Sequence, residues 1–81
     1  MEHAFTRVGN RRYDLIGHLR SDPLGAEGDW IFVQRSGDRL PDSCDGQRLE
    51  FRFSMLDAVG TVRLDQRSRM VKAEGSLRVA A

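Results

Sequence analysis

Apolar and polar residues alternate along much of the chain with a period of two, which is typical of half-buried β-strands. The clearest example is 48–55, where Leu49, Phe51, Phe53 and Met55 share one face and charged or polar residues occupy the other. Residues 55–59 are the one place where we expect a single helical turn. Similar alternation predicts further strands at 4–8, 13–19, 30–33, 61–65 and 76–80, with 30–33 apolar on both faces.

Residues that favour turns separate these segments, because glycine adopts positive φ without steric cost and Asp and Asn bond to their own backbone. Short strands with frequent turns, in one domain spanning 1–81, favour an all-β fold. We predict a small antiparallel β-barrel of five or six strands, because closure removes exposed strand edges. The stretch between Phe53 and Leu77 has room for an additional strand around Val62 and Leu64. The turn residues are Gly9-Asn10, Asp22-Pro23-Leu24-Gly25, Gly28-Asp29, Ser36-Gly37-Asp38, Pro41-Asp42, Asp45-Gly46, Gly60 and Glu74-Gly75.

The charge balance limits the partners that this chain can bind. Its 81 residues include 13 Lys and Arg against 12 Asp and Glu, a net charge of +1, which argues against a purely electrostatic grip on nucleic acid or on a membrane. All but one of the basic residues are Arg, which suits planar recognition of phosphates and stacking on bases, although codon bias gives the same composition. Four basic residues are concentrated in 63–72: Arg63, Arg67, Arg69 and Lys72. They indicate either a basic loop that follows a phosphate backbone or a hairpin with solvated side chains.

The residues that could carry covalent or metal chemistry are few. Cys44 is the only cysteine, so an internal disulfide is impossible. No apolar run has the length of a signal peptide or a bilayer span, and we expect a cytoplasmic protein without membrane contact. His3, His18 and Cys44 lack the paired spacing of a metal site, and neighbouring aspartates should raise the pKa of the Cys44 thiol. We therefore expect no metal, no cofactor, no catalytic residues and no enzymatic activity.

Three stretches of the chain are similar, in order, to the motifs of one family. Residues 11–16 (Arg-Arg-Tyr-Asp-Leu-Ile) are similar to K-G-[FY]-G-F-[IV], residues 31–34 (Ile-Phe-Val-Gln) to V-F-V-H, and residues 46–51 to G-Q-x-V-x-F. From about residue 11 to residue 79 the chain thus resembles the cold-shock domain, a five-stranded oligonucleotide-binding (OB) barrel, with 77–79 as its closing strand. Leu15 stands in place of the family's second aromatic residue, and Gln34 in place of its His.

This resemblance implies which side chains face outward. The residues matching the family's nucleic-acid contacts are Tyr13, Leu15, Phe32 and Gln34, and alternate side chains on neighbouring strands share one face. The opposite face then forms the core, made of Ile16, Ile31, Val33, Leu49, Phe51 and Phe53.

We therefore predict a module that binds single-stranded RNA or DNA with low sequence preference. Each stacked base contributes about 1–3 kcal/mol, and arginines around the rings contact phosphates. The alternative is a small β-barrel protein-interaction or inhibitory module that has lost nucleic-acid binding, including a homodimer formed through an exposed strand edge. The candidate nucleic-acid-binding residues are Arg11, Arg12, Tyr13, Leu15, Trp30, Phe32, Gln34, Arg35 and Arg52.

Overall fold

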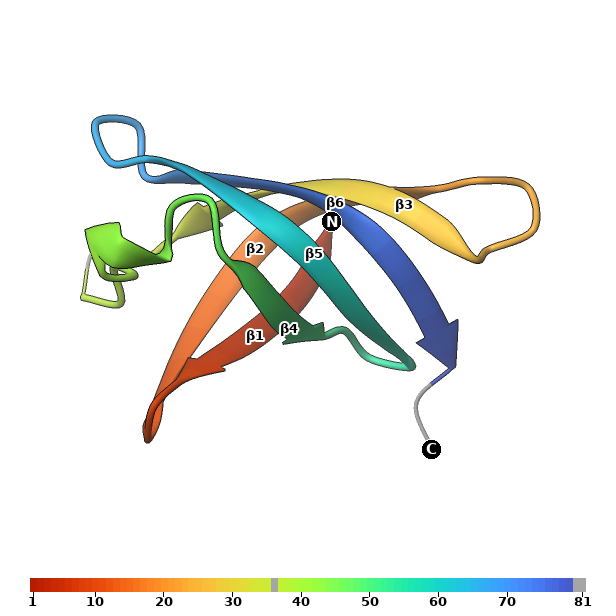
Figure 1. Cartoon of the computed structure of the whole chain (residues 1–81), viewed down its shortest axis with the longest axis horizontal. Helices are drawn as coiled ribbons and strands as arrows, with labels where there is room; N and C mark the ends of the chain where they lie inside the picture. The colour runs from red at the N-terminus through yellow and green to blue at the C-terminus, as the bar shows by residue number, and fades with distance from the viewer. Residues whose placement is uncertain (36, 80–81) are drawn as a thin grey trace.

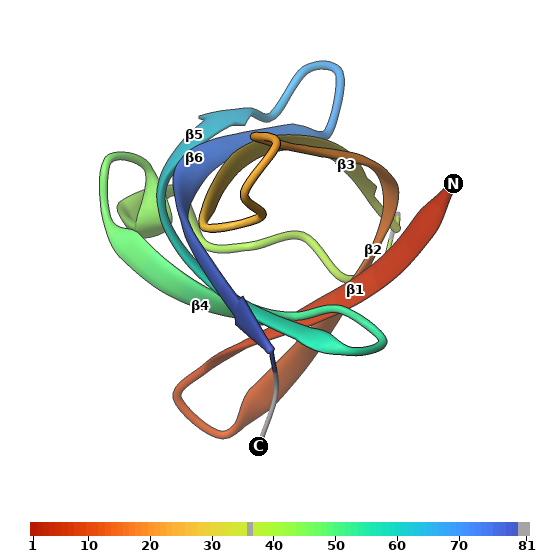
Figure 2. The same ribbon diagram turned by 90° about the vertical axis from the view of Figure 1, so that its right-hand side faces the viewer.

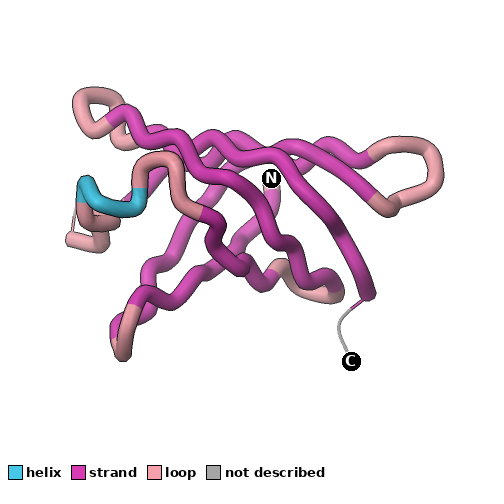
Figure 3. Tube along the Cα trace, in the orientation of Figure 1, coloured by secondary structure: helices cyan, strands magenta, loops and turns pink. Residues whose placement is uncertain are grey.

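The computed structural model describes residues 1–35 and 37–79, and the all-β prediction is confirmed. Figures 1 and 3 show that strands make up most of this part of the chain and that one short 3₁₀ turn, η1 (Asp42–Cys44), interrupts them. Ser36 and Ala80, which two of the predicted segments include, lie outside the described residues. The six strands of the described chain are β1 (Glu2–Val8), β2 (Arg11–Ser21), β3 (Glu27–Gln34), β4 (Arg48–Arg52), β5 (Leu56–Asp65) and β6 (Met70–Val79).

The strands form two consecutive three-stranded meanders, β1-β2-β3 and β4-β5-β6, which close on each other as a barrel. Their order around the barrel is β1-β2-β3-β6-β5-β4, and every neighbouring pair is antiparallel. Figure 2 shows the closed ring from one end. The architecture confirms the predicted small antiparallel barrel and is compatible with an OB-like fold. The additional strand predicted around Val62 and Leu64 is β5.

The two meanders are joined by two strand pairs, or seams, of unequal length. β3 and β6 pair continuously from Glu27–Ser76 to Val33–Met70. In the described chain, β1 and β4 pair only at Phe5–Arg52 and Thr6–Phe51. A hydrogen bond from the Thr6 hydroxyl to the carbonyl oxygen of Glu50, at 2.6 Å, reinforces this short seam. The first residues of β1 therefore extend past β4.

Aromatic rings fill the interior of the barrel. Trp30 contacts Phe51 and Phe53 edge to face, with ring centroids 5.3 and 5.9 Å apart, and Phe32 contacts Phe53 in the same way at 5.4 Å. This geometry is preferred because the positive edge of one ring meets the negative face of the other. With Tyr13, five of the six aromatic residues of the chain are buried in this core.

Three glycines lie in one row across β3, β6 and β5, where Gly28 faces Gly75 and Gly75 faces Gly60. A Cβ atom at Gly60 would lie 2.7 Å from ring carbons of Trp30, and one at Gly75 would overlap the carbonyl oxygen of Val59. The glycines thus allow the three strands to approach closely and leave space for the indole ring.

The connection between β3 and β4 crosses one end of the barrel (Figure 2), where Leu40 is buried. The side-chain oxygen of Gln34 accepts a hydrogen bond from the backbone N–H of Leu40 at 2.6 Å. The Gln34 amide nitrogen donates to Gln66 at 3.1 Å, and Gln66 donates to the carbonyl oxygen of Leu40 at 2.8 Å. Buried polar groups need hydrogen-bond partners, and this network provides them for Gln34 in the core. The same hydrogen bonds fix the connection between β3 and β4 against the barrel.

Two local predictions were wrong at the turn between β4 and β5. The strand predicted over 48–55 ends at Arg52, and Met55 is exposed. The backbone N–H of Phe53 donates to the carbonyl oxygen of Leu56 at 2.9 Å, which closes a tight turn and lets β5 begin at Leu56. A helical turn at 55–59 is therefore absent from the described chain.

Candidate nucleic-acid interface

The predicted stacking residues do not form an exposed platform. The side chains of Tyr13, Leu15, Trp30, Phe32 and Gln34 are all inside the barrel, with 0–5% of their surface exposed. The cause is that β2 and β3 carry apolar residues on both faces, so that the alternation leaves their orientation open, and the larger side chains fill the interior. The prediction that Tyr13, Leu15, Phe32 and Gln34 face outward was therefore wrong.

The core prediction was wrong for the residues on β2 and β3 and correct for those on β4. Ile31 and Val33 of β3 are 42% and 39% exposed, and Ile16 of β2 is half-buried. On β4 the prediction was correct, because Phe51 and Phe53 are buried and Leu49 packs against them.

Phe5 is the one aromatic residue outside the core among the described residues. Along β1, Ala4 and Thr6 are buried, which places Phe5 on the outer face. The guanidinium carbon of Arg12 lies 3.9 Å from the centroid of the Phe5 ring, and that of Arg7 lies 5.8 Å away. Planar guanidinium groups stack on aromatic faces, so this surface already contains one cation–aromatic stack.

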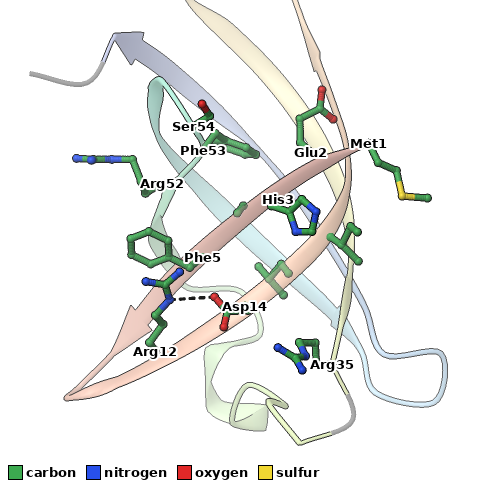
Figure 4. Close-up of a pocket in the computed structure, with 13 residues that line it drawn as sticks. Met1, Glu2, His3, Phe5, Arg12, Asp14, Arg35, Arg52, Phe53 and Ser54 are labelled. Carbon is green, nitrogen blue, oxygen red and sulfur yellow. Dashed lines mark hydrogen bonds and ion pairs between the residues drawn. The ribbon is translucent and has the colours of Figure 1, made fainter.

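A groove of about 870 Å³ lies beside this stack (Figure 4), lined by outward-facing residues of β1 and β2 and also by the buried Ala4, Leu15 and Phe53. Four of the predicted residues line it: Arg12, Leu15, Arg35 and Arg52. Phe5, His3 and Ile16 line it as well. The sequence analysis did not assign Phe5, considered His3 only as a metal ligand and placed Ile16 in the core. The signal for Phe5 is its position between Ala4 and Thr6, two small residues suited to the inside of a strand. The groove has a mostly apolar lining, with three guanidinium groups and the carboxylates of Glu2 and Asp14 around it.

Ion pairs hold two of these arginines in place. Arg12 Nε donates to Asp14 Oδ1 at 2.9 Å (dashed in Figure 4), and Arg52 donates to both carboxylate oxygens of Asp57. The hydrogen bonds and charge of Asp57 raise the pKa of Arg52. Exposed pairs of this kind contribute only about 0–1 kcal/mol to stability, so their main effect here is to orient the guanidinium groups. Arg35 is exposed and has no carboxylate at ion-pair distance among residues 1–35 and 37–79.

Arg11 is not among the residues that line the groove. Its guanidinium donates to the carbonyl oxygen of Gly37 at 2.9 Å and lies 3.9 Å from the Asp38 carboxylate. It also lies 5.2 Å from the centroid of the Tyr13 ring. Arg11 therefore holds the loop after β3 rather than lining the groove.

The four basic residues of 63–72 lie on the hairpin formed by β5 and β6, at the left of Figure 1. Arg63 faces Lys72 directly across the two strands. Arg69, at the end of the turn, has a positive φ of 60°, a conformation that costs a non-glycine residue about 1–2 kcal/mol. Hydrogen bonds from Ser68 lower the pKa of Asp65, the one acidic residue of this segment.

The structure offers little for other chemistry. Cys44 is buried, and burial raises the pKa of its thiol; the predicted direction agrees, but the cause is desolvation rather than the neighbouring aspartates. No group of three or more His, Cys, Asp or Glu side chains in the described ranges could hold a metal ion. The part of the chain that the structure describes contains no helix long and apolar enough to cross a membrane.

Comparisons with family models, curated proteins and solved structures found no match to the chain. The fold is therefore given by the structure itself, and the function is inferred from the outer surface of the barrel.

Proposed function

We propose that this protein is a cold-shock-like barrel module that binds single-stranded nucleic acid with low sequence preference, on the outer face of β1 and β2. The observation that carries this proposal is the stack of Arg12 on Phe5, at 3.9 Å, inside a groove with a mostly apolar lining. A base extends such a stack, because bases pack on both guanidinium planes and aromatic rings. Stacking tolerates any base, since every base has a π face.

The phosphates of the bound strand have partners around the same groove. Arg35 forms no ion pair with the described residues, and Asp57 orients Arg52 beside the Phe5 ring. Arg35 can bind phosphate oxygens through two parallel N–H groups, whereas Arg52 donates Nε and Nη2 to Asp57 and has only its other N–H groups for a phosphate. The net charge of +1 means that these few contacts and the stacking, rather than the overall charge, supply the affinity. The groove volume lies within the range of about 300–1,000 Å³ that ligand sites occupy.

The decisive experiment is a titration of labelled single-stranded DNA and RNA oligonucleotides, followed by fluorescence anisotropy at low salt. Phe5→Ala should weaken binding about 5- to 150-fold, the equivalent of 1–3 kcal/mol for a stacked base. Arg12→Ala should weaken it as well. Arg20→Ala is the matched control, because Arg20 forms a 2.9 Å ion pair with Asp29 at the other end of β2, as Arg12 does with Asp14.

Two results would contradict the proposal. One is the absence of binding to any oligonucleotide at low salt, and the other is an equal effect of Arg12→Ala and Arg20→Ala. A specific protein captured by the tagged barrel, unaffected by nuclease treatment and lost with Phe5→Ala, would instead support a protein-interaction module that uses the same groove.

A further inference from the structure

The β5–β6 hairpin carries positive charge in positions that are unfavourable for the fold. Arg63 and Lys72 face each other directly, and like charges in opposite positions destabilise a pair of strands. Arg69 occupies a left-handed conformation, with φ 60°, that glycine or asparagine adopts more easily. Both features place a cation on the outside of the same hairpin. Local costs that the fold does not need are expected at functional sites.

This charge is only partly offset within the described structure, where the positive charge of Lys72 contributes to the lowered pKa of Asp65. Arg63, Arg67, Arg69 and Lys72 form no ion pair among the described residues. The Asp65 carboxylate accepts hydrogen bonds from the backbone N–H groups of Arg67 and Ser68 instead, at 3.1 and 3.3 Å. The hairpin is therefore available to an anionic partner.

The hairpin is continuous with the groove along β1 and β2. Ile16 lines the groove and faces Val33, and Val33 faces Met70, the first residue of β6 after the hairpin turn. The backbone N–H of Gln34 donates to the carbonyl oxygen of Arg69 at 2.9 Å, so Arg35, another residue of the groove, follows directly beside the turn. An outward apolar row and one arginine thus join the two regions.

We propose that the hairpin residues Arg63, Arg67, Arg69 and Lys72 bind the phosphates of the strand whose base stacks in the groove, so that one nucleic-acid chain crosses β1, β2, β3 and β6. This inference rests on the proposed function and extends its site. A repeating phosphate backbone fits the arrangement because it delivers negative charge along its length, while the apolar row between the two ends contacts sugars and bases. Barrels of this size contact about 4–16 nucleotides, and the groove alone accounts for the short end of that range.

The test compares oligothymidylates of about 4 and about 16 nucleotides, using wild-type protein and Arg67→Gln/Lys72→Gln. We expect the long oligonucleotide to bind the wild type at least tenfold more tightly than the short one. The double variant should lose most of that gain and leave the short oligonucleotide's affinity unchanged. The dependence of log affinity on log salt for the long oligonucleotide should become shallower by about 0.7 for each cation removed. Arg20→Gln/Arg78→Gln removes the same charge elsewhere and should retain the length effect.

Arg69→Gly provides a second variant, because glycine suits the positive φ and folding is therefore preserved. It should weaken binding of the long oligonucleotide less than Arg67→Gln/Lys72→Gln does, because it removes one cation rather than two. The inference is overturned if the hairpin variants weaken both lengths equally, if they weaken neither, or if polyglutamate binds as tightly as the long oligonucleotide. If Phe5→Ala leaves short-oligonucleotide binding unchanged while the hairpin variants still abolish the length effect, the groove proposal fails and the hairpin site stands.

Discussion

Phe32→Ala tests whether the barrel places its large side chains inside, as the structure shows, or outside, as the cold-shock resemblance implies. Phe32 is fully buried, contacts Phe53 edge to face at 5.4 Å, and lies between Gly17 of β2 and Val71 of β6. Truncation of a buried phenylalanine removes its transfer free energy and leaves a cavity, at a cost of about 3–5 kcal/mol. A domain of this length has a total stability of about 4–12 kcal/mol, so the variant should be close to unfolding.

The matched control is Ile31→Ala, one position earlier on the same strand. Ile31 is 42% exposed on the opposite face, and its truncation should cost less than about 1 kcal/mol. The difference between two neighbouring substitutions is more trustworthy than either absolute value.

Urea denaturation followed by the fluorescence of Trp30 measures both variants, because this single tryptophan is 1% exposed in the folded barrel and enters water on unfolding. In thermal denaturation followed by the same fluorescence signal, we expect the melting temperature of Phe32→Ala to fall by more than about 12 °C. Equal losses for the two variants, or an unchanged stability of Phe32→Ala combined with a loss of oligonucleotide binding, would refute the inward placement of Phe32.

Three further substitutions follow from the structure. Gln34→Ala should destabilise the barrel by at least about 1–3 kcal/mol in urea denaturation, because it leaves a buried backbone N–H without a partner; an unchanged midpoint would show that the network is unimportant. Gly75→Ala should lower the melting temperature strongly, since its methyl group would overlap a backbone carbonyl oxygen, whereas Gly37→Ala, in open space, should not. The depressed pKa of Asp65 means that its ionised form stabilises the hairpin at any pH above the ordinary aspartate pKa. This contribution is lost as the pH falls through the lowered value. Asp65→Asn should therefore remove part of the acid destabilisation measured by thermal denaturation, and parallel pH profiles for variant and wild type would contradict this.

The alternation in the sequence predicts clearly where strands occur, but it identifies the buried face of only some of them. On β4 the face opposite Leu49 and Phe51 consists of charged residues, so the alternation identifies both the strand and its buried side. β2 and β3 differ because apolar residues occur on both of their faces, such as Ile16 beside Leu15. There the buried side is decided by which set of side chains fills the closed interior, and this depends on contacts between strands far apart in sequence.

In the candidate site, the arginines could be predicted from the local sequence, whereas their aromatic partner depends on pairing between strands. Arg12 and Arg35 were found because they flank predicted strands, and Arg52 because it lies on the charged face of β4. Their aromatic partner was missed because Phe5 lies on β1, outside the stretches that resemble the family motifs. Its contact with Arg12 and its pairing with Arg52 both depend on the register of β1 against its two neighbours.

The short pairing between β1 and β4 gives the closed barrel a preferred place to open. Two positions close this seam, whereas β5 and β6 are paired along their whole length, and closure joins Phe5 to a residue much later in the chain. Because pairing across a long loop is slow and costs entropy, we expect the two meanders to form first and to dock last. Amide protons near this seam should then exchange with solvent faster than those of β5 and β6. At high concentration the same opening provides a route by which two chains exchange their halves.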